Sequence, residues 1–181
     1  MKNQSLTRQL RNLTYSAVCL ALAQLLPMVT GNIPEIGNML CPMHIPVLLC
    51  GFLCGMPWGT LVGAVAPILR SLIFTRPVLY PTALTMMFEL ATYGFLAGLL
   101  YRLLPKKPLS VYVSLLGAML GGRIVGGLAQ LVLLSLNGKG MTGAYFFTEY
   151  FVNAWPGMVL QVILIPPVVI AMRHSKLMRD Q

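Results

Sequence analysis

The chain has 181 residues, of which 57% are hydrophobic and 9% are charged, and its mean hydropathy is +0.77. A water-soluble domain is excluded, because so much apolar surface has to face lipid rather than water. The net charge of +9 does not indicate a nucleic-acid-binding surface, since the basic residues cluster beside the ends of apolar segments, as membrane topology requires.

Six apolar segments follow one another along the chain, and each is interpreted as a membrane-spanning helix. The first follows Arg8 and Arg11 without the cleavage site of a signal peptide, so we expect it to remain in the mature protein. The second is short, and we expect it to be tilted or incomplete. The predicted spans are 13–29, 45–55, 58–74, 82–104, 109–136 and 150–172. The sequence therefore predicts an all-α membrane protein, a single domain over residues 1–181 formed by a bundle of six transmembrane helices.

Lysine and arginine residues gather in three groups along this predicted topology. The groups are Lys2, Arg8 and Arg11; Arg102, Lys106 and Lys107; and Arg173, Lys176 and Arg179; the opposite side holds Arg76, Lys139, Glu35 and Glu149. With six spans all three groups lie on one side of the membrane, and cytoplasmic loops carry the excess of positive charge. We therefore expect both termini to lie in the cytoplasm and the protein to lie in the cell membrane.

Pairs of small residues four positions apart recur in the predicted spans. They are Ala17/Ala21, Gly51/Gly55, Gly59/Gly63, Gly94/Gly98, Gly117/Gly121 and Gly122/Gly126. Such pairs let helix backbones approach closely. Packing inside the bundle is the first interpretation for each pair, and a pair that faces lipid would instead mark the docking surface of a partner.

Three charged residues, Arg70, Glu89 and Arg123, fall within the predicted spans. A charge in the hydrocarbon region is costly unless it is paired or hydrated, so each is expected to face the bundle interior. One interpretation is an ion-pair network that only holds the bundle together. The other is a binding cavity open to the outside, in which one glutamate cannot neutralise two arginines and the residual charge attracts a carboxylate or a phosphate. We favour the cavity.

Amide and aromatic residues extend this predicted binding site. An amide can orient a polar ligand and a ring can cover its apolar part, so the site is expected to include Tyr93, Asn153, Trp155 and Gln161. Trp155 is equally typical of the membrane interface, and Gln161 of a bridge between helices. His44, which has prolines on both sides, is interpreted as a structural hydrogen-bonding residue.

The sequence contains no motif that indicates catalysis. It lacks a carboxylate pair at depth, a Ser-His-Asp or H-E-x-x-H pattern and a phosphate-binding loop. The four cysteines lack zinc-site spacing and are interpreted as packing residues. We therefore expect no enzyme activity, no cofactor and no metal, and any ATP hydrolysis that drives transport has to come from another chain.

Several segments carry a resemblance to a known family. The run Ala17-Val-Cys-Leu-Ala21 looks like an A-x-x-x-A docking motif, and the segments 42–55, 69–74, 81–83 and 88–94 are similar to those of riboflavin and pantothenate binders. Together with the small size, the six apolar spans and the basic ends, they resemble the substrate-binding S components of energy-coupling factor (ECF) transporters, which are vitamin importers of the ABC class. The resemblance covers nearly the whole chain.

The resemblance implies partners and a binding site. Ala17 and Ala21 would meet a membrane-embedded coupling subunit, which works with two cytoplasmic ATPases. Ligand contacts would come from the outer connections and the outer halves of the later spans, where Arg70, Glu89, Tyr93, Arg123 and Asn153 lie. The two arginines make an anionic vitamin such as pantothenate the first guess.

Two other functions stay open from the sequence. A stand-alone secondary transporter driven by protons would use Glu89 as its proton carrier. An intramembrane enzyme or a purely structural membrane subunit would retain no tightly bound small molecule.

Overall fold

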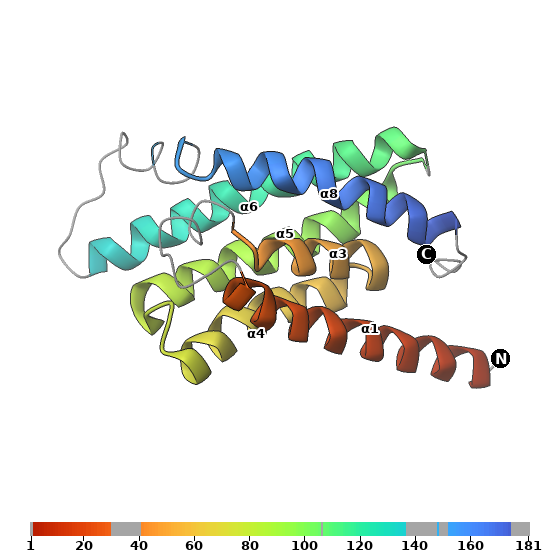
Figure 1. Ribbon diagram of the computed structural model, residues 1–181, viewed down its shortest axis with the longest axis horizontal. Coiled ribbons are helices and arrows are strands. Elements are labelled where there is room, and N and C mark those ends of the chain that lie inside the picture. The colour runs from red at the N-terminus through yellow and green to blue at the C-terminus, as the bar shows by residue number, and fades with distance from the viewer. Residues whose placement is uncertain (1, 30–40, 106, 137–147, 149–151, 175–181) are drawn as a thin grey trace.

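The computed structural model describes residues 2–29, 41–105, 107–136, 148 and 152–174, and the described chain is helical throughout, without a strand (Figure 1). The elements are α1 (Lys2–Val29), α3 (His44–Cys54), α4 (Met56–Phe74), the short turn η1 (Leu79–Ala83), α5 (Leu84–Leu103), α6 (Pro108–Leu136) and α8 (Trp155–His174). The predicted all-α class is confirmed.

Four of these helices, α4, α5, α6 and α8, are long and apolar enough to cross a membrane, and η1 and α5 together form one such stretch. Helix α3 has 11 residues, which corresponds to about 16 Å and is short of a hydrocarbon core of about 30 Å. Helix α1 has 28 residues, but its first half is polar and basic. The described residues therefore show four candidate spans with two further helices, where six spans were predicted.

The ends of the helices gather at two ends of the bundle (Figure 1). The start of α1, the connection from α5 to α6 and the end of α8 lie at one end. The end of α6, the start of α8 and the turn from α4 into α5 lie at the other. The described basic residues Arg8, Arg102 and Arg173 therefore belong to the same end, as the charge pattern predicts.

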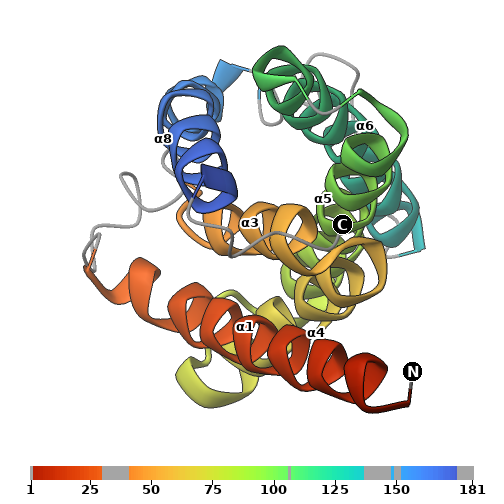
Figure 2. The same cartoon turned by 90° about the vertical axis from the view of Figure 1, so that its right-hand side faces the viewer.

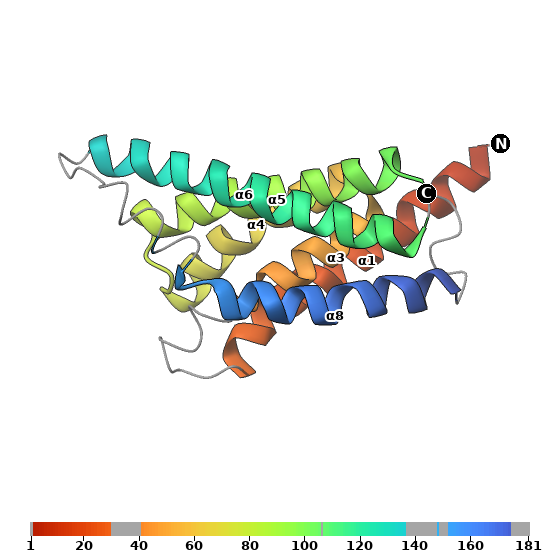
Figure 3. The ribbon, with the colours of Figure 1, turned by 90° about the horizontal axis from the view of Figure 1, so that it is seen from above.

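Helix α3 occupies the middle of the bundle. It contacts α1, α4, α5 and α8, and the view along the helices shows α1 and α4 on one side of it and α8 on the other (Figure 2). Figure 3 shows α5 between α4 and α6, with α1 crossing the other helices obliquely. Helix α3 is thus surrounded by protein, which explains why nearly all of its residues are buried although it is short.

Glycines bring α3, α4 and α5 into backbone contact. A Cβ atom added to Gly94 would lie 2.1 Å from the carbonyl oxygen of Gly59, and one added to Gly63 would lie 2.2 Å from that of Leu90. Gly55 ends α3 with a φ of 86° and its N–H bonds to the carbonyl of Gly51, so α4 can fold back against α3. The interpretation of these glycines as internal packing residues is confirmed.

The largest apolar core lies between α3, α5, α6 and α8. It includes Phe52, Tyr93, Leu115 and Ile165, all of them fully buried. The outward face of α6 instead exposes a row of large apolar side chains, namely Leu109, Val113, Leu116, Leu120, Ile124, Leu128 and Val132. Such a face is typical of a helix surrounded by lipid.

Candidate functional site

Glu89 lies at the centre of a buried polar cluster to which α3, α5 and α6 each contribute. Its Oε1 atom lies 3.1 Å from Nη1 of Arg123 and 3.4 Å from Nε2 of His44. Tyr93 donates its hydroxyl hydrogen to the same oxygen over 3.2 Å. Glu89, Arg123 and His44 are each no more than 5% exposed, so the carboxylate is removed from solvent and paired with the guanidinium.

Two features position these side chains, the spacing of Glu89 and Tyr93 along α5 and the glycines of α6 that pack against them. Glu89 and Tyr93 are four residues apart and therefore share one face of α5. Helix α6 presents glycines to that face, because a Cβ atom on Gly122 would lie 2.2 Å from the Tyr93 ring and one on Gly126 would lie 2.8 Å from Cβ of Glu89. The His44 ring packs edge-on against Tyr93, with 5.1 Å between the ring centroids.

Two nitrogen atoms of the cluster have no hydrogen-bond partner among the described residues, Nε of Arg123 and Nδ1 of His44. The Nη2 atom of Arg123 donates to the sulfur of Cys41 over 3.7 Å, and sulfur is a weak acceptor. Buried nitrogen atoms are paired in nearly all folded proteins. The cluster is therefore stabilised internally through Glu89 and still has an unpaired donor, Nε of Arg123, and the unpaired Nδ1 of His44 for an additional polar group.

Arg70 does not join this cluster, contrary to the expectation that the three charges converge. Its Nη1 atom donates to the backbone oxygen of Gln24 over 2.9 Å, and its guanidinium carbon lies 5.2 Å from the centroid of the Phe74 ring. Arg70 lies apart from Glu89 because the face of α4 that carries it is directed toward α1. Ala66, one turn earlier, packs with Ala23 of α1, so Arg70 joins α4 to α1.

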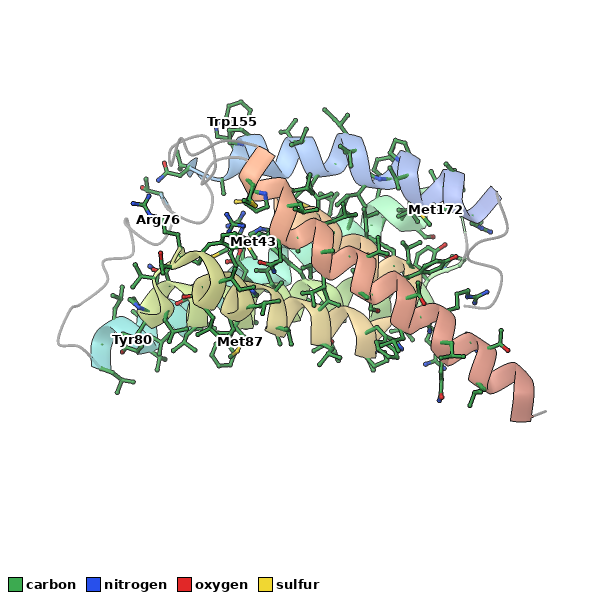
Figure 4. The ribbon with its side chains drawn as sticks, turned by 60° about the horizontal axis from the view of Figure 1, so that its bottom comes forward. Met43, Arg76, Tyr80, Met87, Trp155 and Met172 are labelled. Carbon is green, nitrogen blue, oxygen red and sulfur yellow. The ribbon has the colours of Figure 1, made fainter. Side chains whose placement is uncertain are left out.

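Asn153 and Trp155, two of the predicted substrate-binding residues, are both exposed. The backbone N–H of Asn153, an exposed residue, donates to the carbonyl of Thr148 over 2.8 Å. Trp155 is 58% exposed, and Figure 4 shows its ring directed away from the bundle. The position of Trp155 is that of a residue at the membrane interface.

Gln161 is the α8 residue that faces the interior. It is fully buried, and neither atom of its side-chain amide has a partner among the described residues. Met158 and Ile165, about one turn before and after it, pack into the core that contains Tyr93. The interpretation as a bridge between helices therefore finds no described hydrogen bond, whereas an inward-facing amide is what the predicted binding site requires.

Ala17 and Ala21, the predicted partner-binding residues, lie on the exposed side of α1. Cys19 and Ala23 lie on the opposite side and pack against the bundle. Helix α1 thus presents its small residues outward, where they do not serve internal packing.

A separate hollow of about 350 Å³ lies near the other end of the molecule, between the first half of α1 and the start of α4. It is lined by Leu6, Gln9, Leu10, Leu13 and Trp58. Its walls are mostly apolar, and none of the predicted substrate-binding residues contributes to it.

Sequence reasoning missed two members of the cluster. His44 was interpreted as structural and Cys41 as a packing residue, yet both contact the Glu89–Arg123 pair. The signal available was the depth of Glu89 and Arg123, which requires polar neighbours. The sequence does not identify these neighbours, because Cys41 and His44 are brought beside Glu89 by the packing of α3 against α1, α5 and α8.

The comparisons with known proteins identify the family of the chain. The family model for the ECF transporter substrate-specific component matches residues 11–169, a stretch that contains the whole of α3, α4, α5 and α6. No curated protein and no solved structure gives a match. Components of this family bind small molecules and work with a membrane-embedded coupling subunit and ATPases. The chain is a multi-pass protein of the plasma membrane, and it belongs to the family of substrate-specific components of ECF transporters.

Proposed function

We propose that this chain captures a vitamin or a related small solute from outside the cell and delivers it to a coupling subunit and two ATPases for uptake. The first candidate is pantothenate or another anionic vitamin. The proposal is supported by the family match and by one structural observation, the buried cluster of Glu89, Arg123, His44 and Tyr93 with two unpaired nitrogen atoms.

The cluster is suited to a solute that combines polar and apolar parts. Arg123 provides an unpaired donor and His44 an unpaired ring nitrogen, and the rings of Tyr93 and His44 provide an apolar wall. Gln161 faces the same core and adds a donor and an acceptor for an amide or hydroxyl group.

The preference for an anion rests on Arg123 alone, because Arg70 lies elsewhere. Glu89 and Arg123 together carry no net charge, so a bound carboxylate adds one negative charge to the cluster. The Arg123 guanidinium, which contacts Glu89 at 3.1 Å, can also bind an anion through its remaining donor atoms. The site therefore has a charged donor group for an anion.

Delivery to the coupling subunit is assigned to α1. Ala17 and Ala21 are exposed on the side of α1 that faces away from the bundle, and small residues at this spacing let another helix approach closely. Capture and delivery thus use different sides of the molecule, and each can be tested alone.

The test of capture is extraction of bound solute. The full chain is purified in mild detergent, examined by native mass spectrometry and then denatured, and any vitamin released is identified. A co-purifying vitamin supports the proposal. The absence of any bound vitamin, together with no stabilisation by any member of a vitamin panel, would overturn it.

We predict that Arg123→Ala weakens binding of the identified vitamin by at least about tenfold, because a lost charge-assisted hydrogen bond in a buried site costs about 1.4 kcal/mol or more. Binding is measured by isothermal titration calorimetry. The matched control is Arg102→Ala, which removes an exposed arginine from the last turn of α5 and should leave the affinity unchanged. An unchanged affinity in folded Arg123→Ala would make Arg123 purely structural.

The purified chain in liposomes distinguishes capture from proton-driven transport. Uptake of the vitamin in response to a proton gradient, without partner subunits and lost in Glu89→Gln, would assign the chain to stand-alone transport. We expect no uptake under these conditions.

A further inference from the structure

Arg123 uses only part of its guanidinium group within the protein. Its Nη1 atom contacts Glu89 at 3.1 Å, its Nη2 atom has the 3.7 Å contact with the Cys41 sulfur, and its Nε atom has no partner among the described residues. In the planar guanidinium group the N–H bond of Nε is parallel to one N–H bond of Nη2, along the edge that does not include Nη1. This pair of donors matches the two oxygens of a carboxylate.

We propose that the Nε–Nη2 edge of Arg123 binds a carboxylate of the solute, and that the carboxylate displaces the Cys41 sulfur from this edge. The inference rests on the proposed function and adds the atoms that recognise the solute and the chemical class of the recognised group. Glu89 keeps Nη1 occupied and so fixes the orientation of the guanidinium, with the second edge left for the ligand.

Replacing the Cys41 sulfur by a carboxylate gives Arg123 stronger hydrogen bonds. A carboxylate oxygen forms a charge-assisted hydrogen bond with arginine, whereas a thiol sulfur is a weak acceptor. A carboxylate also satisfies Nε, which is buried with no described partner, and buried donors are costly when unpaired. Two bonds of the stronger kind thus replace one of the weaker kind.

Cys41 differs from the other cysteines in a way that makes the exchange measurable. Cys19, Cys50 and Cys54 are buried, whereas Cys41 is partly exposed, just before the start of α3. Alkylation requires that a reagent reach the sulfur, which the partial exposure of Cys41 allows. A carboxylate bound between the guanidinium and the sulfur covers the sulfur and lowers its reactivity.

The experiment measures alkylation of Cys41 by N-ethylmaleimide in the full chain in detergent. The thiolate sulfur adds to one alkene carbon of the maleimide, a C–S bond forms, and the other alkene carbon takes a proton from water. The rate is followed by intact mass and peptide mapping in sodium acetate and in sodium chloride of equal ionic strength. We expect saturating acetate to slow the alkylation of Cys41 by at least about threefold, since two bonds to one edge bind a carboxylate in preference to chloride.

Arg123→Lys is the decisive variant. Lysine keeps a positive charge beside Glu89, so the buried carboxylate stays paired, but it lacks the planar edge with two donors. Acetate and chloride should therefore give equal alkylation rates in Arg123→Lys. The denatured chain controls for effects of acetate on the reaction itself, because all four cysteines should then react equally in both salts.

Two outcomes of the alkylation experiment overturn the inference. One is an equal Cys41 rate in acetate and chloride for the unchanged chain, and the other is the same slowing in Arg123→Lys. Failure of the proposed function is a separate result, because it is the absence of any co-purifying or stabilising vitamin. A bound vitamin whose affinity is the same for Arg123→Lys would leave the proposed function standing and reject the carboxylate edge.

Discussion

Glu89 accepts hydrogen bonds from its own helix and from two neighbouring helices, so its removal affects three elements at once. In Glu89→Gln the guanidinium of Arg123 becomes a buried charge without a counter-charge, which should lower the free energy of unfolding by about 3–5 kcal/mol. The measurement is denaturant or thermal unfolding of the purified variant in mild detergent.

The double variant Glu89→Gln with Arg123→Gln is the matched control for this prediction. Both charges are then absent, and two amides can bond to each other, so the double variant should be more stable than Glu89→Gln alone. If the effects of the two single substitutions simply add, Glu89 and Arg123 do not stabilise each other.

At the scale of single residues, the sequence predicted the members of the buried polar cluster that are costly in a membrane. Glu89 and Arg123 stand out as charges inside apolar runs, and Tyr93 follows from its four-residue spacing to Glu89. Arg70 has the same charge, but its direction depends on which face of α4 meets α1. That choice is made by packing between helices, which hydropathy along one chain does not contain.

At the scale of elements, α4 and α5 are held together by contact between their backbones. Gly94→Ala should prevent this contact, because its Cβ atom would lie 2.1 Å from the carbonyl oxygen of Gly59 and neither backbone can move without separating the helices. We expect folded protein to be lost or its melting temperature to fall sharply, as measured by size-exclusion chromatography and thermal unfolding.

Gly117→Ala provides the comparison for Gly94→Ala. Its Cβ atom would meet Cδ1 of Leu100 at 2.8 Å, and the far end of a leucine can rotate away at small cost. The helix propensity of alanine exceeds that of glycine, so Gly117→Ala should fold normally. Equal loss of folded protein in both variants would show that small residues are needed at both positions for another reason.

The positions of the helices were largely predictable because apolar runs mark them, but their lengths and their starts were less so. Helix α1 begins at Lys2, well before the apolar run that starts at 13, because hydropathy does not record helix formation in a polar segment. The 11 residues of α3 resemble a short span in the sequence. Their burial against four helices is what makes an incomplete span tolerable.

At the scale of the whole molecule, the charge pattern predicts the orientation in the membrane. The start of α1 and the end of α8 lie at the same end of the bundle (Figure 1), and Arg8, Arg102 and Arg173 belong to that end. A phosphatase fused after Gln181 should therefore be inactive, since it would remain in the cytoplasm, whereas a fluorescent protein fused there should be active. The opposite pattern would place the basic end outside.

The separation between the proposed capture site and the proposed docking surface is also a property of the whole molecule. The Glu89 cluster lies between α3, α5 and α6, whereas Ala17 and Ala21 lie on the outer side of α1. A bulky side chain on that outer side does not enter the bundle, but it keeps a partner helix at a distance. Ala21→Trp should therefore leave vitamin binding unchanged and abolish ATP-driven uptake in cells that also produce the coupling subunit and the ATPases.

Two further variants separate the effect of position from the effect of size. Ala21→Ser keeps a small side chain at the docking surface and should retain uptake. Val113→Trp adds the same bulk to an exposed position of α6, away from α1, and should also retain it. Loss of vitamin binding in Ala21→Trp would mean that this side of α1 packs inside the protein, and loss of uptake in Val113→Trp would mean that the coupling subunit contacts α6 as well.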